Sequence, residues 1–188
     1  MNWLCIFPTD IVTQSINRTV RNVFQATGEP SIYALPPLVP VVELSQYISK
    51  HELQHIIPAT IRPASYSTLA FKQISNNQRK EGILYFPIQP TSILNSIYKT
   101  LYNSPAMPVM KNPDPVLSEC CGIFLCKWHT STPPLKVFKT DIEPKNPTQY
   151  SIGLISITPL SERIKWYNAC EWEIEWELSP QALPFEEP

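Results

Sequence analysis

The sequence predicts an α+β domain in which helices pack on the outside of mostly antiparallel strands. Short apolar runs rich in β-branched and aromatic residues recur along the chain, and such runs are typical of strands. Between them lie segments with helical spacing, in which Ile16, Val20 and Val23 form one apolar stripe. Residues 171–178 alternate strictly between glutamate and apolar residues, which predicts a half-buried strand with an acidic solvent face.

The composition is that of a globular protein with a core. Of the 188 residues, 43% are hydrophobic and 16% are charged, which supplies enough apolar surface for folding. We expect one domain over residues 1–178 and a Pro-rich acidic tail over residues 179–188. The net charge of −1 gives no overall attraction to nucleic acid, so double-stranded DNA is not an expected partner.

The cysteines and the N-terminus predict a cytoplasmic protein. The five cysteines are odd in number and include no Cys-x-x-Cys pair, and Cys5 and Cys126 lie inside apolar runs. We therefore expect reduced thiols. The N-terminus has no basic region followed by an apolar core, and no apolar run approaches the roughly 18 residues of a membrane span. No membrane association is expected.

Prolines and the few glycines divide the chain into elements. A strand over residues 2–7 precedes a helix that begins near Thr9 or Asp10 and ends at Gly28. The Pro36-Pro37 pair delays the following strand until Val39. The other predicted elements are strands over 31–35, 67–75, 83–88, 122–128, 152–160 and 171–178, and helices over 46–57 and from 90–92 onward.

The order and spacing of these segments resemble the two-histidine (2H) phosphoesterase superfamily, which includes the RNA 2′,3′-cyclic phosphodiesterases. NWLCIFPTDIVTQSINRTV is similar to the family's first strand and helix, and LPPLVPVVEL to the segment that carries its first His-x-Thr motif. GILYFPIQPTSILNSIYKTL resembles the strand, turn and helix that follow, and GIFLCKW falls at the second motif strand. The resemblance implies a bilobal domain whose two motifs face a central groove.

Neither motif keeps its catalytic residues in this chain. Leu38 and Pro40 stand at the His and Thr of the first motif, and Gly122 and Phe124 stand at those of the second. In the family the histidines act as general base and general acid, and the hydroxyls hold phosphate oxygens. None of the four residues here has a side chain that transfers a proton or donates a hydrogen bond. The resemblance thus implies a non-catalytic module, without cofactor or metal, whose inter-lobe groove binds a nucleotide, RNA or a protein segment.

Two other constellations remain as alternatives. His129 and Ser131 form a His-x-Ser, which could act on a cyclic phosphodiester, but it lies at the end of a predicted strand. His51, Glu52 and His55 match His-Glu-x-x-His, in which two imidazoles on one helix face bind zinc and the carboxylate activates water. This helix is short and no motif supplies an evident third ligand, so a solvated helix face is the commoner explanation.

Overall fold

The computed structural model describes residues 1–8, 10–54, 64–66, 70–73, 82–89, 92–105, 107–128 and 150–178. Their elements, in chain order, are β1 (Asn2–Pro8), α1 (Asp10–Thr27), the 3-10 helix η1 (Pro30–Tyr33), β2 (Val39–Leu44), α2 (Lys50–Gln54), β3 (Ala64–Tyr66), β4 (Ala70–Gln73), β5 (Gly82–Gln89), α3 (Ser92–Tyr102), α4 (Pro115–Ser118), β6 (Gly122–Trp128), β7 (Tyr150–Pro159) and β8 (Cys170–Leu178).

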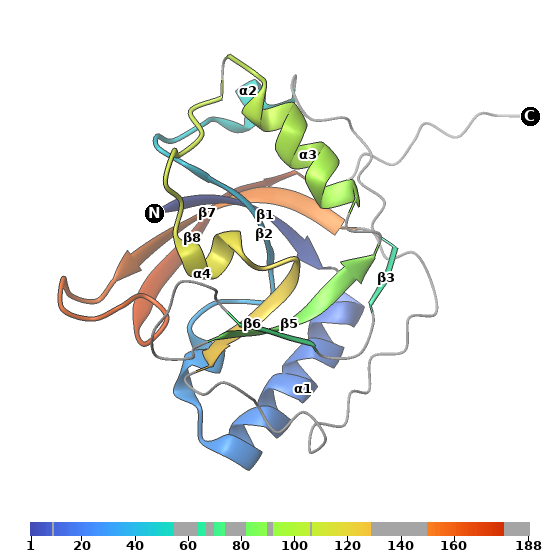
Figure 1. Cartoon of the computed structure of the whole chain (residues 1–188), viewed down its shortest axis with the longest axis vertical. Coiled ribbons are helices and arrows are strands. Elements are labelled where there is room, and N and C mark those ends of the chain that lie inside the picture. The colour runs from blue at the N-terminus through green and yellow to red at the C-terminus, as the bar shows by residue number, and fades with distance from the viewer. Residues whose placement is uncertain are drawn as a thin grey trace, which may run out of the picture.

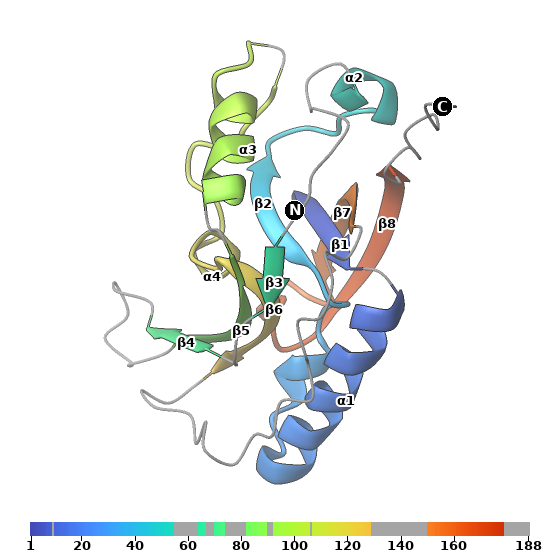
Figure 2. The same ribbon diagram turned by 90° about the vertical axis from the view of Figure 1, so that its right-hand side faces the viewer.

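The described strands form two antiparallel sheets, and this confirms the predicted α+β class. The first sheet has the order β2-β1-β7-β8. In the second sheet β5 pairs with β6 along one edge and with β4 and β3 along the other. The helix α1 lies at one end of the molecule, and α2 and α3 lie at the opposite end (Figures 1 and 2).

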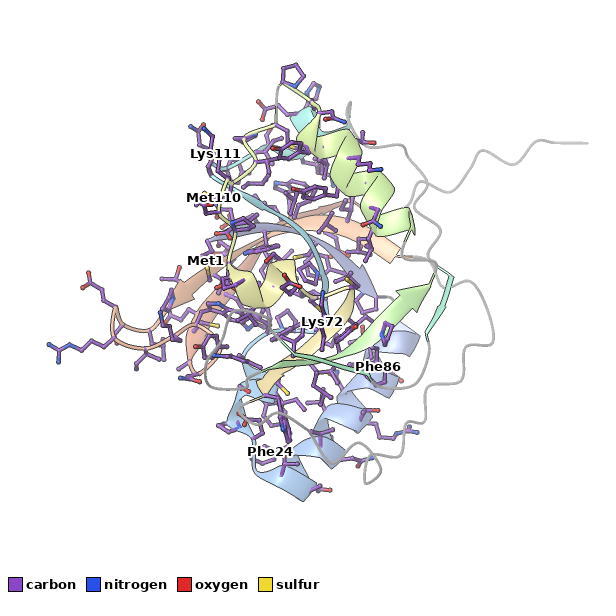
Figure 3. The ribbon with its side chains drawn as sticks, in the orientation of Figure 1. Met1, Phe24, Lys72, Phe86, Met110 and Lys111 are labelled. Atoms are coloured by element: carbon purple, nitrogen blue, oxygen red, sulfur yellow. The ribbon has the colours of Figure 1, made fainter. Side chains whose placement is uncertain are left out.

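A backbone bridge joins the two sheets. Leu38, just before β2, pairs with Phe124 of β6 in an antiparallel bridge. A cluster of buried apolar residues lies on each face of the joined sheets. One core cluster includes Ile16 of α1 and the fully buried Phe86 of β5 (Figure 3), and the other includes Trp3 and Leu38. Because each cluster takes residues from both sheets, the sheets share a core on each face.

The first helix ends where the sequence predicts. Gly28 has a φ of +68°, and its amide donates to the carbonyl oxygen of Phe24 at 2.7 Å. This is the left-handed position after a helix, which glycine occupies without the strain of a Cβ. Figure 3 shows Phe24 at this end of the molecule, far from Met110. The Phe24 ring meets that of Tyr33 edge-to-face, with centroids 5.1 Å apart.

The strand predicted over residues 31–35 is wrong, because most of this segment belongs to η1. The Glu29 carboxylate accepts hydrogen bonds from the Ser31 amide at 3.2 Å and from its hydroxyl at 2.7 Å. Pro30 supplies the helical φ at the first position. A side-chain cap followed by proline therefore starts a helical turn in spite of the apolar residues that follow.

The strand β8 contains a bulge that the strict alternation of its sequence does not predict. Opposite residues 154–155 of β7 the register shifts by one residue, and such a shift turns the following side chains to the other face. Trp172 and Ile174 lie on one face, where they are 43% and 37% exposed. Trp176 and Leu178 pack on the other face, against the core that contains α1. The prediction that all four apolar residues share a face is therefore wrong.

Candidate functional site

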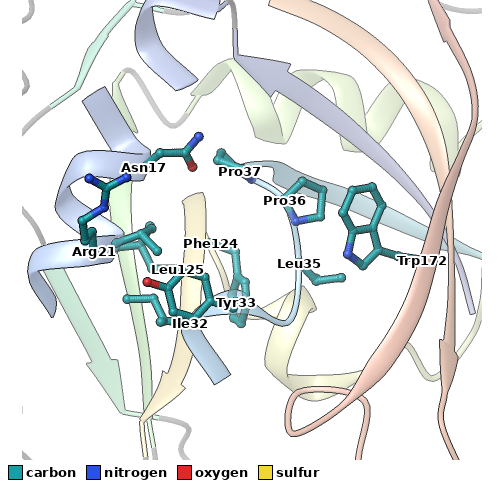
Figure 4. Close-up of a pocket in the computed structure, with 11 residues that line it drawn as sticks. Asn17, Arg21, Ile32, Tyr33, Leu35, Pro36, Pro37, Phe124, Leu125 and Trp172 are labelled. Carbon is teal, nitrogen blue, oxygen red and sulfur yellow. The ribbon is translucent and has the colours of Figure 1, made fainter. Parts of the chain in front are cut away.

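A pocket of about 350 Å³ opens where α1 and η1 meet β6 and the turn of residues 35–37 (Figure 4). Its apolar lining includes Ile32 and the β6 residues Phe124 and Leu125, all of which belong to the buried core. The volume is at the lower end of the range of small-molecule sites, roughly 300–1,000 Å³. The walls come from packed elements, so the pocket is part of the folded framework.

Polar side chains reach this pocket from α1. Asn17 and Arg21 lie four residues apart, and this spacing places them on the same face of the helix. Both are exposed. Within the described ranges, the Arg21 guanidinium has no carboxylate partner and no hydrogen-bond acceptor. Its fixed fork of N–H donors is therefore available to an anionic group.

Aromatic rings border the pocket on its other sides. Tyr33 of η1 is 55% exposed and Trp172 of β8 is 43% exposed. Figure 4 shows Trp172 beside Pro36, across the pocket from Arg21. Exposed aromatic faces of this kind stack on planar rings such as nucleobases. Sequence analysis missed this site because its residues come from segments far apart in the chain.

The structure brings Leu38 and Phe124 together but encloses them. Leu38 is completely buried, and Phe124, which is 2% exposed, contributes to the pocket lining. Pro40 is also buried and lies opposite Cys5 of β1. Because β2 is at an edge of its sheet, the missing amide hydrogen of Pro40 is tolerated there. Of these positions, Phe124 is the one that borders the pocket.

Position 122 is closed to every side chain in this fold. Gly122 lies opposite Pro87 of β5. A Cβ at this position would overlap the carbonyl oxygen of Phe86. Histidine at position 122 is therefore incompatible with the way β5 and β6 pair.

The Glu52 carboxylate stabilises the first turn of α2. Its carboxylate accepts hydrogen bonds from the amide and the hydroxyl of Ser49, at 2.9 Å and 2.7 Å, and these bonds lower the pKa of Glu52. Ser49 and Glu52 thus form a capping box, for which Ser-x-x-Glu is the sequence signal. The predicted start of this helix at residue 46 is wrong, because α2 begins at Lys50.

The other residues of the two alternative sites are placed as follows. His51 is exposed on α2, and His55 lies outside the described residues. In the described part of the chain, no three His, Cys, Asp or Glu residues are grouped so that they could hold a metal ion. His129 and Ser131 also lie outside the described residues, so the His-x-Ser site stays a prediction.

The buried carboxylate of Glu43 connects β2 to α4. It accepts the amide hydrogen of Asp114 at 2.6 Å. Burial raises the pKa of Glu43, and the neighbouring Asp114 carboxylate adds to this effect. Asp114 in turn caps α4 and accepts a hydrogen bond from Trp166 Nε1 at 3.0 Å. Neither carboxylate lines the pocket, so their interactions are structural.

The cysteines are free thiols, as predicted. Burial raises the pKa of Cys5, Cys120 and Cys126, which makes these thiols poor nucleophiles. None of the three lines the pocket. They therefore serve as small apolar residues of the core.

No protein-family model, curated protein or solved structure matches this chain. The resemblance to the 2H phosphoesterases therefore rests on the order and spacing of its segments. Among the helices that the structure describes, none combines the length and the hydropathy needed to cross a membrane.

Proposed function

We propose that this chain is a non-catalytic relative of the 2H phosphoesterases that binds a nucleotide or the end of a short RNA in the pocket between α1 and β6. The observation that carries this proposal is the pocket lining. The Arg21 guanidinium, which has no partner among the residues that the structure describes, lies across from the exposed ring of Trp172. A nucleotide combines an anionic phosphate with a flat aromatic base, so it matches both sides of the pocket.

The phosphate and the base of the nucleotide each have a matching side chain in the pocket. The phosphate binds to Arg21, with the Asn17 amide as a further donor. The base stacks on Trp172 or Tyr33, the exposed rings of the rim. The volume of about 350 Å³ suits one nucleotide better than several residues of a protein segment. This is why a nucleotide is preferred over a peptide at this site.

The chemistry of the pocket and of the motif positions supports the proposed lack of catalysis. Leu38 and Phe124 are apolar, and position 122 accepts no side chain. The described lining of the pocket contains no histidine, carboxylate or cysteine that could act as a base at neutral pH. A bound phosphodiester would therefore be held without proton transfer from these residues.

Calorimetric titration with 5′-AMP, 2′,3′-cyclic AMP and a short oligoadenylate tests the proposal. We expect binding that Arg21→Ala weakens about 10- to 100-fold, because a charged hydrogen bond contributes about 1.5–3 kcal/mol. Arg21→Lys keeps the charge but loses the planar fork, so it should have an intermediate effect. Arg163→Ala is the matched control, since Arg163 is exposed in the loop between β7 and β8, and it should bind like the wild type.

Two results would contradict the proposal. The binding site is wrong if these ligands do not bind, or if Arg21→Ala binds them as well as the wild type does. The non-catalytic assignment is wrong if purified protein hydrolyses 2′,3′-cyclic AMP and His129→Ala abolishes the turnover. A zinc content of about one equivalent that is lost in His55→Ala would support the zinc hydrolase instead.

A further inference from the structure

The strand β8 leaves one of its edges open. It is the outermost strand of the order β2-β1-β7-β8, as Figure 2 shows, and no described strand pairs with its outer edge. The N–H and C=O groups along such an edge form a template for another extended chain. Many proteins cover or interrupt edges of this kind, so the residues beside β8 decide how accessible it is.

The chain itself covers the C-terminal half of β8. Trp176 Nε1 donates to the carbonyl oxygen of Ile48 at 2.9 Å, and Lys50 Nζ donates to the carbonyl oxygen of Glu177 at 2.7 Å. A lysine ammonium thus already binds a backbone acceptor of this acidic strand. Within the described part of the chain, residues 171–174 have no hydrogen bonds apart from the pairing with β7, and the Trp172 ring lies beside Pro36 in the wall of the pocket (Figure 4).

Apolar side chains are exposed along the same hairpin. Trp172 and Ile174 lie on one face of the open half, with exposures of 43% and 37%. Leu160 and Ile164, in the loop that projects from the body in Figure 1, are 57% and 39% exposed. Several large apolar residues are thus exposed on one hairpin, which favours an interaction surface there.

The charge of β8 determines which partner fits. Glu171 and Glu173 are exposed on the face opposite Trp172 and Ile174, and residues 170–178 include no lysine or arginine. An added strand with alternating basic and apolar residues places its cations beside the glutamates and its apolar side chains beside Trp172 and Ile174. Opposite charges on neighbouring strands stabilise such pairs.

Charge pairing between neighbouring strands also disfavours a second copy of β8 as the partner at this edge. Residues that face each other across an antiparallel pair share a side of the sheet. If residues 171–174 paired with themselves, each glutamate would face another glutamate or an apolar side chain. The first arrangement is repulsive and the second leaves the carboxylates unpaired.

We infer that residues 171–174 of β8 bind an extended segment of another protein by strand addition, and that this segment carries lysine or arginine at alternating positions. This mode takes its affinity from backbone hydrogen bonds and its specificity from the alternating side chains. This surface shares Trp172 with the nucleotide pocket but does not include Arg21, so Arg21→Ala separates peptide binding from nucleotide binding.

Short blocked peptides of alternating sequence test this inference on the full chain. The probes are a lysine–valine peptide, a glutamate–valine peptide of equal length, and the lysine–valine peptide with alternate amides N-methylated. Calorimetry gives the affinities and amide exchange locates the contact. We expect the lysine–valine peptide to bind at least about tenfold more tightly than either other peptide, and to slow exchange within residues 171–174.

Charge reversal supplies the matched variants. Glu171→Lys combined with Glu173→Lys should reverse the preference towards the glutamate–valine peptide, whereas Glu162→Lys, in the preceding loop, should leave it unchanged. Arg21→Ala should bind the lysine–valine peptide like the wild type. The inference is overturned if the N-methylated peptide binds equally well, if charge reversal has no effect, or if no peptide binds at millimolar concentration. If the protein instead forms dimers as its concentration rises, and the amides of residues 171–174 are then protected from exchange, the edge pairs with a second copy of the chain.

Discussion

The amide nitrogen of Phe124 donates to the carbonyl oxygen of Leu38 at 2.9 Å, and this hydrogen bond connects the two sheets. The side chains of both residues are at most 2% exposed and belong to the same core cluster. The resemblance to the 2H phosphoesterases places a catalytic histidine at position 38 and a phosphate-binding hydroxyl at position 124. In this chain both positions are filled by apolar side chains of that core cluster, and Phe124 also borders the pocket.

Leu38→Ala should destabilise the protein strongly. Leu38 is completely buried, and truncating such a residue typically costs about 2–5 kcal/mol because a cavity remains. Urea unfolding measures the change. Leu160→Ala is the control, because Leu160 is 57% exposed and its truncation should cost less than about 0.5 kcal/mol. Equal effects of the two substitutions would mean that position 38 is not part of the core.

Gly122→Ala should be far more damaging than Gly28→Ala. A Cβ at position 122 would overlap the Phe86 carbonyl oxygen, so β5 and β6 would have to separate. At Gly28 there is open space, and the cost is only the left-handed φ, about 1 kcal/mol. Thermal unfolding and expression yield rank the two variants. If Gly122→Ala were as stable as Gly28→Ala, the pairing of β5 with β6 at this position would be wrong.

Trp176→Phe should loosen α2. The substitution removes the hydrogen bond from Trp176 Nε1 to the Ile48 carbonyl, which is worth about 0.5–1.5 kcal/mol. Amide exchange of residues 49–54 should therefore become faster. Trp172→Phe changes the same side chain on the exposed face of β8 and should leave this exchange unchanged. Faster exchange in both variants, or in neither, would contradict this role of Trp176.

Glu43→Gln should stabilise the protein at neutral pH. Burial raises the pKa of Glu43 above its ordinary value of 4.5, so the folded state binds its proton more tightly than the unfolded state does. The contribution of Glu43 to stability is thus full below pH 4.5 and is lost as the pH rises through the folded pKa. The amide oxygen of glutamine still accepts the hydrogen bond from the Asp114 backbone.

Urea unfolding of the wild type and Glu43→Gln at acidic and neutral pH checks this linkage. The two proteins should be similar in stability when Glu43 is protonated, and the variant should gain relative to the wild type as the pH increases. Other carboxylates titrate in both proteins and cancel in the difference. A variant that is less stable than the wild type at pH 7 would show that the ionised carboxylate is favourable there.

Local patterns predicted the long elements well. The stripe of Ile16, Val20 and Val23 predicted α1, and Gly28 marked its end because only glycine occupies that conformation without strain. Apolar runs bounded by turn residues predicted β1, β5, β6 and β7 to within a few residues. The short helices are harder to predict from the sequence, because a single side-chain cap determines where each of them begins. The Asp114 cap of α4 and the Glu29 cap of η1 start helical turns that the apolar pattern does not indicate.

The sequence by itself determined the α+β class and the positions of the main strands and α1, because these depend on residue type and local spacing. Tertiary structure alone decided which faces are buried and which residues meet. The bulge in β8 arises from its register against β7 and separates Trp172 from Trp176, although the sequence alternates perfectly. The proposed site likewise exists only because long-range packing brings Arg21 and Trp172 to the same pocket.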